Sequence, residues 1–192
     1  MKNNIILIGM MGSGKTTIGK QVAKLLNYSF IDTDSLIEEK MKMSIEEIFF
    51  KHGENYFRKI EQEIVNELEQ TWQTGRRKSQ INNRPCLPQM VIATGGGIIL
   101  SEINRSKLVD LGIVIYLNST SSCLIKNLEF AKNDRPLLRN VEKKEKIEQL
   151  IEERRSLYEI ADYEIIVENK SVLEISKNII EICSKSKNYG KM

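Results

Sequence analysis

The sequence predicts an α/β fold in which a central sheet of five parallel strands carries helices on both faces. Short apolar segments alternate along the chain with longer amphipathic ones, as strand–helix–strand units require. The apolar segments are continuous hydrophobic runs, which is typical of strands buried on both faces of a parallel sheet. Ligands of such sheets bind beyond the carboxyl ends of the strands, where several polar motifs of this chain fall.

The spacing of apolar residues places the individual elements. Continuous apolar runs predict strands at 5–8, 30–32, 90–93, 113–117 and 165–167. Helical spacing predicts helices at 15–26, 35–51 (one helix or two), 54–72, 143–158 and 172–183, with a further helix after the fourth strand. The basic segment 74–88 is expected to be a polar insertion, either a solvated loop or a contact patch for an acidic partner. The polar residues 185–192 are expected to form a frayed tail.

Composition limits the classes of protein to which the chain can belong. Its 192 residues, 41% of them hydrophobic, suit a single domain spanning 1–192 with a real core. The 29 basic and 26 acidic residues are interspersed, so no nucleic-acid partner is expected. The three cysteines form no CxxC pair, which argues against a zinc site or a disulfide framework. No membrane segment is expected, because no apolar run approaches the roughly 20 residues of a membrane helix. We expect a cytoplasmic monomer.

A phosphate-binding motif follows the first predicted strand. Residues 9–16 read GMMGSGKT, which matches G-x-x-x-x-G-K-[ST] and opens the first predicted helix. The glycines let backbone N–H groups face phosphate oxygens, and the helix N-terminus adds partial positive charge. Lys15 is expected to contact the β- and γ-phosphates, and the hydroxyl of Thr16 to bind Mg²⁺. The motif predicts a three-layer sandwich of the P-loop NTPase type, which binds a nucleoside triphosphate through Gly12, Ser13, Gly14, Lys15, Thr16 and Thr17.

Charged residues follow the second predicted strand and begin the helix 54–72. Near a P-loop, one of Asp32 and Asp34 can hold a magnesium-bound water, and the other can accept the proton of an attacking hydroxyl. Alternatively, Asp34 caps the next helix. Arg58 and Glu61 lie one helical turn apart, so they form either a surface ion pair or an arginine that a carboxylate orients toward an anionic substrate.

Three further segments carry candidate ligand-binding residues. The glycines at 95–97 suit a close approach of a ligand to the backbone, although a flexible turn has the same composition. Residues 128–141 are expected to form a mobile lid, whose Arg135 neutralises charge on a transferred phosphoryl group. At the end of the helix 143–158, Arg154 and Arg155 point about 100° apart, so only one of them is expected to face the site.

Together these motifs resemble those of the shikimate kinase family, and the resemblance extends from about residue 4 to residue 182. It implies a P-loop kinase that uses ATP and Mg²⁺ to phosphorylate the 3-hydroxyl of shikimate, giving shikimate 3-phosphate and ADP in chorismate and aromatic amino acid biosynthesis. The matching motifs, in family order, are the P-loop, Asp32-x-Asp34, Phe57-Arg58-x-x-Glu61, Gly95-Gly96-Gly97, Arg135-Pro136-Leu137-Leu138 and Arg154-x-x-Leu157-Tyr158.

On the acceptor side, the resemblance implies a role for each matched residue. Arg58 and Arg154 are expected to bind the shikimate carboxylate, for which the guanidinium fork is suited. The backbone of Gly96 is expected to contact the substrate. Asp34 is expected to hydrogen-bond the ring hydroxyls and to orient or deprotonate the 3-hydroxyl.

On the nucleotide side, the resemblance implies that Asp32 holds a water bound to Mg²⁺, beside Thr16 as the metal ligand. Arg135 is expected to enter with the lid and contact the transferred phosphate, while lid closure excludes water. Lys15, Asp34 and Arg135 are therefore the expected catalytic residues.

The chain departs from the family pattern at several places. Only Lys126 is basic in 126–129, where the family often has an arginine near the adenine, and Ser156 stands where proline is common. Counting back from Tyr158 selects Arg154 over Arg155 as the substrate ligand. The segment 74–88 is longer than the family's usual link. Two alternatives remain: a P-loop kinase of another small hydroxylated acid or nucleotide, and a nucleotide-binding switch without catalysis.

Overall fold

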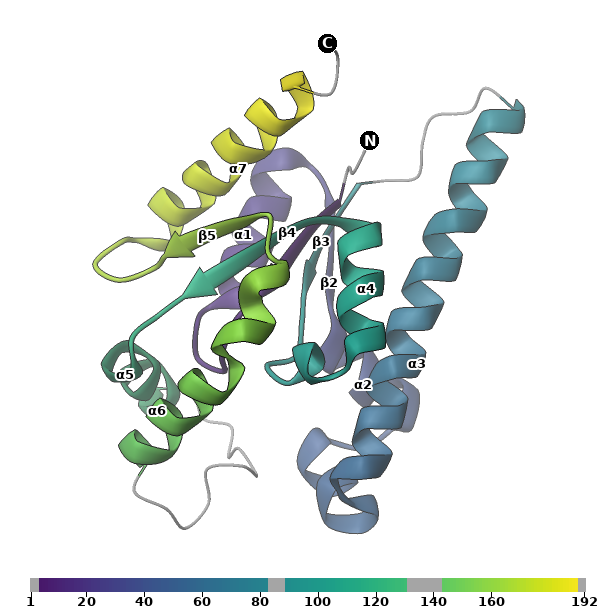
Figure 1. The fold of residues 1–192 in the computed structure, drawn as a ribbon. Helices are drawn as coiled ribbons and strands as arrows, with labels where there is room; N and C mark the ends of the chain where they lie inside the picture. Colours follow the sequence, from purple (N-terminus) through teal and green to yellow (C-terminus); the bar gives the residue numbers. More distant parts are fainter. Residues whose placement is uncertain (1–3, 83–88, 131–142, 190–192) are drawn as a thin grey trace.

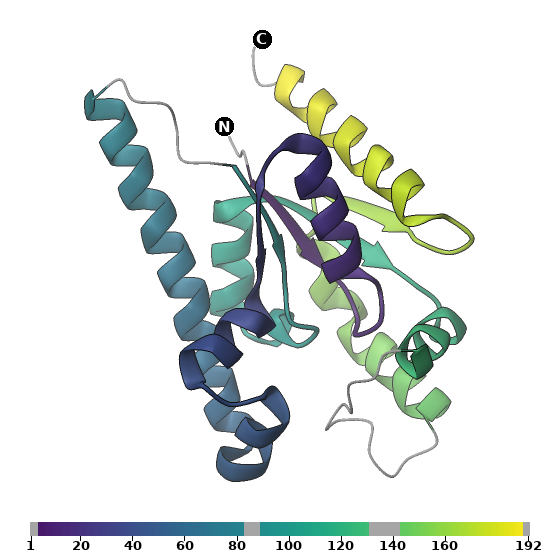
Figure 2. The same ribbon diagram turned by 180° about the vertical axis from the view of Figure 1, so that it is seen from behind.

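The structure, a computed structural model, describes residues 4–82, 89–130 and 143–189 (Figure 1, Figure 2). Its five strands form one parallel sheet in the order β2-β3-β1-β4-β5, which confirms the predicted fold class. The central position of β1 puts the P-loop that follows it in the middle of the carboxyl edge. The strands are β1 (Asn4–Ile8), β2 (Ser29–Asp32), β3 (Met90–Ala93), β4 (Gly112–Asn118) and β5 (Tyr163–Ile166).

Helices cover both faces of the sheet. On one face α1 (Lys15–Leu26) packs beside α7 (Val172–Tyr189). The other face carries α3 (Ile45–Asn82), α4 (Glu102–Leu111) and α6 (Lys143–Arg154). The remaining helical segments are α2 (Thr33–Met41), α5 (Ser121–Phe130) and the short 3₁₀ turns η1 (Ile98–Leu100) and η3 (Arg155–Ile160).

The core consists of two apolar layers separated by the sheet. Ile5 and Leu7 of β1 belong to the layer under α1 and α7, whereas Ile6 and Ile8 belong to the layer under α3, α4 and α6. All four side chains are at most 2% exposed. Because successive side chains of a strand point to opposite faces, a strand covered on both faces needs apolar residues at every position. This requirement explains the continuous apolar runs.

Several helix boundaries differ from the prediction. The region 35–51 forms two helices, and α2 ends where Lys42 adopts a left-handed conformation (φ 53°). The helix α3 bends at Gly53 (φ 79°, ψ 173°) and continues to Asn82, so the loop predicted from residue 74 is wrong as far as Asn82. The segment 74–82 has no proline and several good helix formers, which allows the helix to continue. Residues 83–88 lie outside the described residues.

Two further differences concern the end of α7 and the stretch 98–111. The helix α7 continues to Tyr189, so residues 185–189, part of the segment expected to fray, are helical. The turn η1 and the helix α4 occupy a stretch for which no element was predicted. Within the three described ranges, no helix has the length and apolar character that crossing a membrane requires.

Candidate active site

The P-loop connects β1 to α1 at the carboxyl edge of the sheet. Gly12 and Gly14 adopt left-handed backbone conformations (φ 82° and 86°), which a residue with a Cβ enters only with strain. Lys15 is 8% exposed, and its Nζ donates 2.8 Å hydrogen bonds to the carbonyl oxygens of Gly9 and Met10. The loop therefore curls around a positive charge, as binding of a phosphate group requires.

Asp32 ends β2 and links the P-loop to the next helix. Its Oδ2 accepts a 2.7 Å hydrogen bond from Oγ1 of Thr16. Its Oδ1 accepts from the backbone N–H groups of Asp34 (3.0 Å) and Ser35 (3.4 Å). Asp32 is thus the N-cap of α2, and the alternative in which Asp34 caps this helix is wrong. Asp34 lies in the first turn of α2 instead.

A cavity of about 1060 Å³, which we call the P-loop cavity, opens beside the P-loop. Asp32 and Asp34 line one end of it together with the P-loop. The other end is lined by α5 residues, including Lys126 and Asn127, and by the turn between β5 and α7. Asn127 also donates a 2.8 Å hydrogen bond to the carbonyl of Gly12, which ties α5 to the P-loop. The size of the cavity and its phosphate-binding end are those of a nucleotide site.

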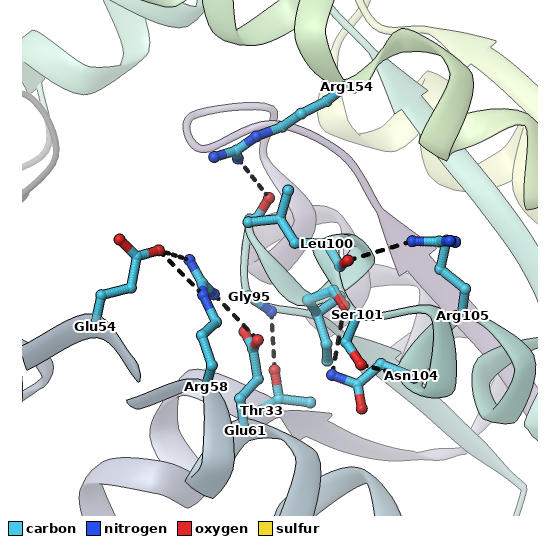
Figure 3. Close-up of polar contacts among 12 residues, drawn as sticks. Thr33, Glu54, Arg58, Glu61, Gly95, Leu100, Ser101, Asn104, Arg105 and Arg154 are labelled. Carbon is cyan, nitrogen blue, oxygen red and sulfur yellow. Dashed lines mark hydrogen bonds and ion pairs between the residues drawn. The ribbon is translucent and has the colours of Figure 1, made fainter. Parts of the chain in front are cut away.

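Arg58 lies between two carboxylates of its own helix (Figure 3). Its Nε and Nη2 donate to Oε1 of Glu54 (3.2 and 2.9 Å), and its Nη1 donates to Oε2 of Glu61 (3.1 Å). The side chain of Glu61 is 1% exposed and that of Arg58 is 22% exposed, so the alternative of a plain surface ion pair is wrong. A Cβ added at Gly97 would lie 2.5 Å from both Nη1 and Nη2, so the loop of glycines 95–97 packs directly against the guanidinium of Arg58.

The carboxyl group of Glu61 lies in an environment that disfavours its charge. Burial raises the pKa of Glu61 to about 7, although the charge and hydrogen bond of Arg58 oppose this shift. The charge of Asp34 adds to the increase. Among the described residues, Oε1 of Glu61 has no hydrogen-bond partner. The carboxyl group is therefore poised between its two protonation forms near neutral pH.

The glycine loop after β3 is packed against its neighbours and is not an open turn. The Gly95 N–H donates a 2.8 Å hydrogen bond to Oγ1 of Thr33 in α2. The Gly96 carbonyl accepts a 3.1 Å hydrogen bond from Nη1 of Arg154. A Cβ added at Gly96 would lie 3.2 Å from the backbone nitrogen of Met11. The loop needs glycine because the P-loop and side chains from two other elements approach it closely.

The two arginines at the end of α6 have different surroundings. Arg154 is 5% exposed and donates to the glycine loop. The side chain of Arg155 is 74% exposed and pairs with Glu152 at 3.5 Å. The structure therefore places Arg154, and not Arg155, at the site.

A smaller cavity, which we call the arginine cavity, adjoins the P-loop cavity. Arg58 and Arg154 line it, together with the glycine loop and apolar side chains of α3. Met11, Asp34 and Gly96 line both cavities. The Asp34 carboxylate consequently stands where a group bound by the two arginines would meet a group bound by the P-loop.

The structure brings most of the predicted site residues together. The P-loop cavity is lined by Gly12, Ser13, Gly14, Lys15, Thr16, Thr17, Asp32 and Asp34, and the arginine cavity by Asp34, Arg58, Gly96 and Arg154. Arg135, with residues 131–141 of the predicted lid, lies outside the described residues.

Two residues at the site were not predicted. Thr33 is fully buried and accepts the hydrogen bond of the glycine loop, and Glu54 holds Arg58 through two of its nitrogens. The sequence carried a weak signal for each of them. Thr33 lies inside the Asp32-x-Asp34 motif, and Glu54 precedes Arg58 by one helical turn.

Comparisons with known proteins agree with this arrangement. A family model described as shikimate kinase matches residues 11–184. The shikimate kinase of Caldanaerobacter subterraneus subsp. tengcongensis is 41% identical over 184 residues, covering 96% of this chain and 98% of its own. That of Alkaliphilus oremlandii is 42% identical over 182 residues, covering 94% and 98%. The structure of shikimate kinase from Acinetobacter baumannii in complex with shikimate superposes with a TM-score of 0.84 at 33% identity, covering 97% of this chain and 96% of that one. With a family match over residues 11–184 and relatives of this identity, the chain belongs to the shikimate kinase family.

Proposed function

We propose that this protein transfers the γ-phosphoryl group of ATP to the 3-hydroxyl of shikimate, giving shikimate 3-phosphate and ADP. One observation carries the proposal. Asp34 stands at the junction of a P-loop cavity and a cavity with two arginines. A kinase needs this arrangement because the acceptor hydroxyl must lie in line with the phosphoryl group that it attacks.

The P-loop binds the triphosphate of ATP. The backbone N–H groups of Gly12 and Gly14 and the N-terminus of α1 would face the phosphates. The N–H of Ser13, which donates to the Met10 carbonyl (3.2 Å) in the structure, would have to turn to join them. Lys15 contacts the β- and γ-phosphates, and to do so its ammonium leaves the carbonyl oxygens that it bonds in the structure. We place the adenine toward α5 and the turn before α7, at the other end of the P-loop cavity.

Thr16 and Asp32 have the chemistry of a magnesium site. Their side-chain oxygens lie 2.7 Å apart beside the P-loop. Mg²⁺ prefers oxygen ligands and is held in kinases by one or two side chains together with phosphate oxygens and water. Thr16 would bind the ion directly, and Asp32 would hold one of its waters. When bound, the ion neutralises charge that develops on the phosphate oxygens.

The arginine cavity binds the acceptor. Arg58 and Arg154 offer N–H groups to a carboxylate, and the backbone of Gly96 contacts the ring. Shikimate has one carboxylate and three ring hydroxyls, so arginines at one end fix which hydroxyl reaches Asp34. A nucleoside monophosphate, the acceptor of some related P-loop kinases, has no carboxylate for the two arginines. Gluconate, the acceptor of others, does have one, so the preference for shikimate over gluconate rests on the family match.

The reaction is a single in-line displacement. The 3-hydroxyl oxygen forms a bond to the γ-phosphorus, the bond from this phosphorus to the β–γ bridging oxygen breaks, and ADP leaves. Asp34 accepts the hydrogen bond of the attacking hydroxyl and is positioned to take its proton. Lys15 stabilises the charge on the phosphate oxygens. Arg135, on the lid, is proposed to contact the transferred phosphoryl group. We also propose that the enzyme acts in the cytoplasm as a monomer.

An assay of ADP release with ATP and Mg²⁺ tests the proposal. Shikimate is expected to stimulate ADP release strongly, whereas gluconate and nucleoside monophosphates are expected not to. Asp34→Asn is the matched variant: it should retain ATP binding and lose turnover by about 100-fold or more, because the attacking hydroxyl loses its proton acceptor. Slow ATP hydrolysis that shikimate leaves unchanged would instead support a nucleotide-binding switch.

A further inference from the structure

We propose that Glu54 is a positioning residue for substrate binding, which holds the guanidinium of Arg58 in the orientation that receives the substrate carboxylate. The inference rests on the proposed function. It assigns a role to a half-exposed carboxylate that lines neither cavity and that would act only through Arg58.

The hydrogen bonds of Arg58 divide its donors between two partners. A guanidinium has five N–H donors. One on Nε and one on Nη2 bond Oε1 of Glu54, and one on Nη1 bonds Oε2 of Glu61. No further hydrogen-bond partner of Arg58 occurs among the described residues, which leaves one N–H on each terminal nitrogen for a ligand.

Glu54 and Glu61 approach Arg58 from different sides. Arg58 and Glu61 line the arginine cavity, whereas Glu54 does not. The side chain of Glu54 is 47% exposed and that of Glu61 is 1% exposed. Figure 3 shows Glu54 and Glu61 on opposite sides of the guanidinium. Glu54 therefore does not occupy the place of the substrate, and its contact leaves the cavity open.

The buried carboxylate of Glu61 competes with the substrate carboxylate for the N–H groups of Arg58. Oε1 of Glu61 has no hydrogen-bond partner among the described residues. A two-point pair with this carboxylate would satisfy that oxygen and consume an N–H that the substrate needs. The contact with Glu54 keeps two nitrogens of Arg58 turned away from Glu61, so it prevents the two-point pair between Arg58 and Glu61. Gly97 packs against the terminal nitrogens and limits other rotations.

Steady-state kinetics of Glu54→Ala test the inference. The KM for shikimate is expected to rise about three- to tenfold. This is less than the complete loss of a charge-assisted hydrogen bond would produce, because Arg58 remains but is less well oriented. The kcat and the KM for ATP are expected to change less than about twofold, because Glu54 touches neither the phosphates nor Asp34. Glu54→Gln keeps a neutral acceptor oxygen and is expected to fall between the wild type and Glu54→Ala.

A control and a double variant separate this role from a structural one. Glu181→Gln removes an exposed carboxylate from an i,i+4 pair with Lys185 (2.7 Å) on α7 and should match the wild type. In an Arg58→Ala background, Glu54→Ala should raise the KM for shikimate no further, since its effect passes through Arg58.

The outcomes distinguish this inference from the proposed function. A wild type that shikimate does not stimulate overturns both. A wild type with normal activity and an unchanged KM in Glu54→Ala overturns only the role of Glu54. A lowered KM in Glu54→Ala also overturns it, because Glu54 would then compete with the substrate. An equal rise of KM with and without Arg58 overturns it as well.

Discussion

Thr16 and Asp32 are joined by a 2.7 Å hydrogen bond between the P-loop and the end of β2. The other oxygen of Asp32 accepts from the backbone N–H of Asp34, at 3.0 Å. A single carboxylate therefore fixes the expected metal ligand relative to the residue expected to receive the acceptor hydroxyl. The side chain of Asp32 therefore aligns the proposed phosphate and metal site with the proposed acceptor site.

Asp32→Asn should separate the two tasks of this carboxylate. Asparagine is as good an N-cap as aspartate, so α2 and the melting temperature should change little. The loss of charge beside Thr16 should lower kcat by about tenfold or more and raise the Mg²⁺ concentration needed for half-maximal rate. A magnesium titration of kcat measures both effects. Asp110→Asn, at an exposed site of α4, is the control. A wild-type magnesium dependence in Asp32→Asn would remove Asp32 from the metal site.

Thr33→Val tests the support of the glycine loop. Thr33 is fully buried, and its Oγ1 accepts the Gly95 N–H at 2.8 Å. Valine has nearly the same shape but leaves this buried N–H without a partner, which should lower the free energy of unfolding by about 1–3 kcal/mol. Urea unfolding measures the change. Thr33→Ser keeps the hydroxyl and should lose less than Thr33→Val. Equal losses in the two variants would show that the methyl group matters and the hydrogen bond does not.

The sequence was informative about the sheet for a physical reason. Strands covered on both faces require an unbroken apolar run, and Ile5 to Ile8 show it without ambiguity. The helix α4 lacks such a pattern: Leu108 and Leu111 are buried, but most of its surface is polar. The extension of α3 was missed because its residues after 74 are polar and give no apolar period.

The site was predictable where a motif carries the chemistry. The P-loop, Asp34, Arg58 and Arg154 have types and spacings that indicate their roles, and the ends of parallel strands bring them together. Thr33 acts on a backbone group 62 residues away, so no local pattern reveals it. Counting back from Tyr158 selected Arg154 over Arg155, and the burial of Arg154 beside the exposed Arg155 agrees with that choice.

Gly97→Ala should disturb substrate binding without disturbing the fold. Gly97 has an ordinary φ of −107°, so alanine brings no backbone strain. Its Cβ would lie 2.5 Å from Nη1 and Nη2 of Arg58, and the guanidinium must move to avoid it. The KM for shikimate should rise by about tenfold or more, because Arg58 no longer meets the carboxylate. The KM for ATP, measured in the same variant, should stay unchanged. A rise in both constants would mean that the loop, and not Arg58, had moved.

Glu61→Gln should change how stability depends on pH. Burial raises the pKa of Glu61 to about 7 in the native state, from an ordinary value of 4.5. Between these values the native state binds more protons than the unfolded state, so the stability of the wild type falls as pH rises. The contribution of Glu61 is full below pH 4.5 and is lost as the pH rises through about 7. Glutamine does not titrate, so its variant should lack this fall.

Urea unfolding of both proteins between about pH 4.5 and pH 8 measures the difference. The stability of Glu61→Gln relative to the wild type should increase over this interval by up to about 3 kcal/mol and then remain constant. Most of the change should occur below pH 7, because the native carboxyl group is largely ionised above it. Glu39→Gln, at an exposed position of α2, controls for the loss of a carboxylate itself. A difference that did not vary with pH would show that Glu61 is ionised throughout, and Arg58 would then outweigh the effect of burial.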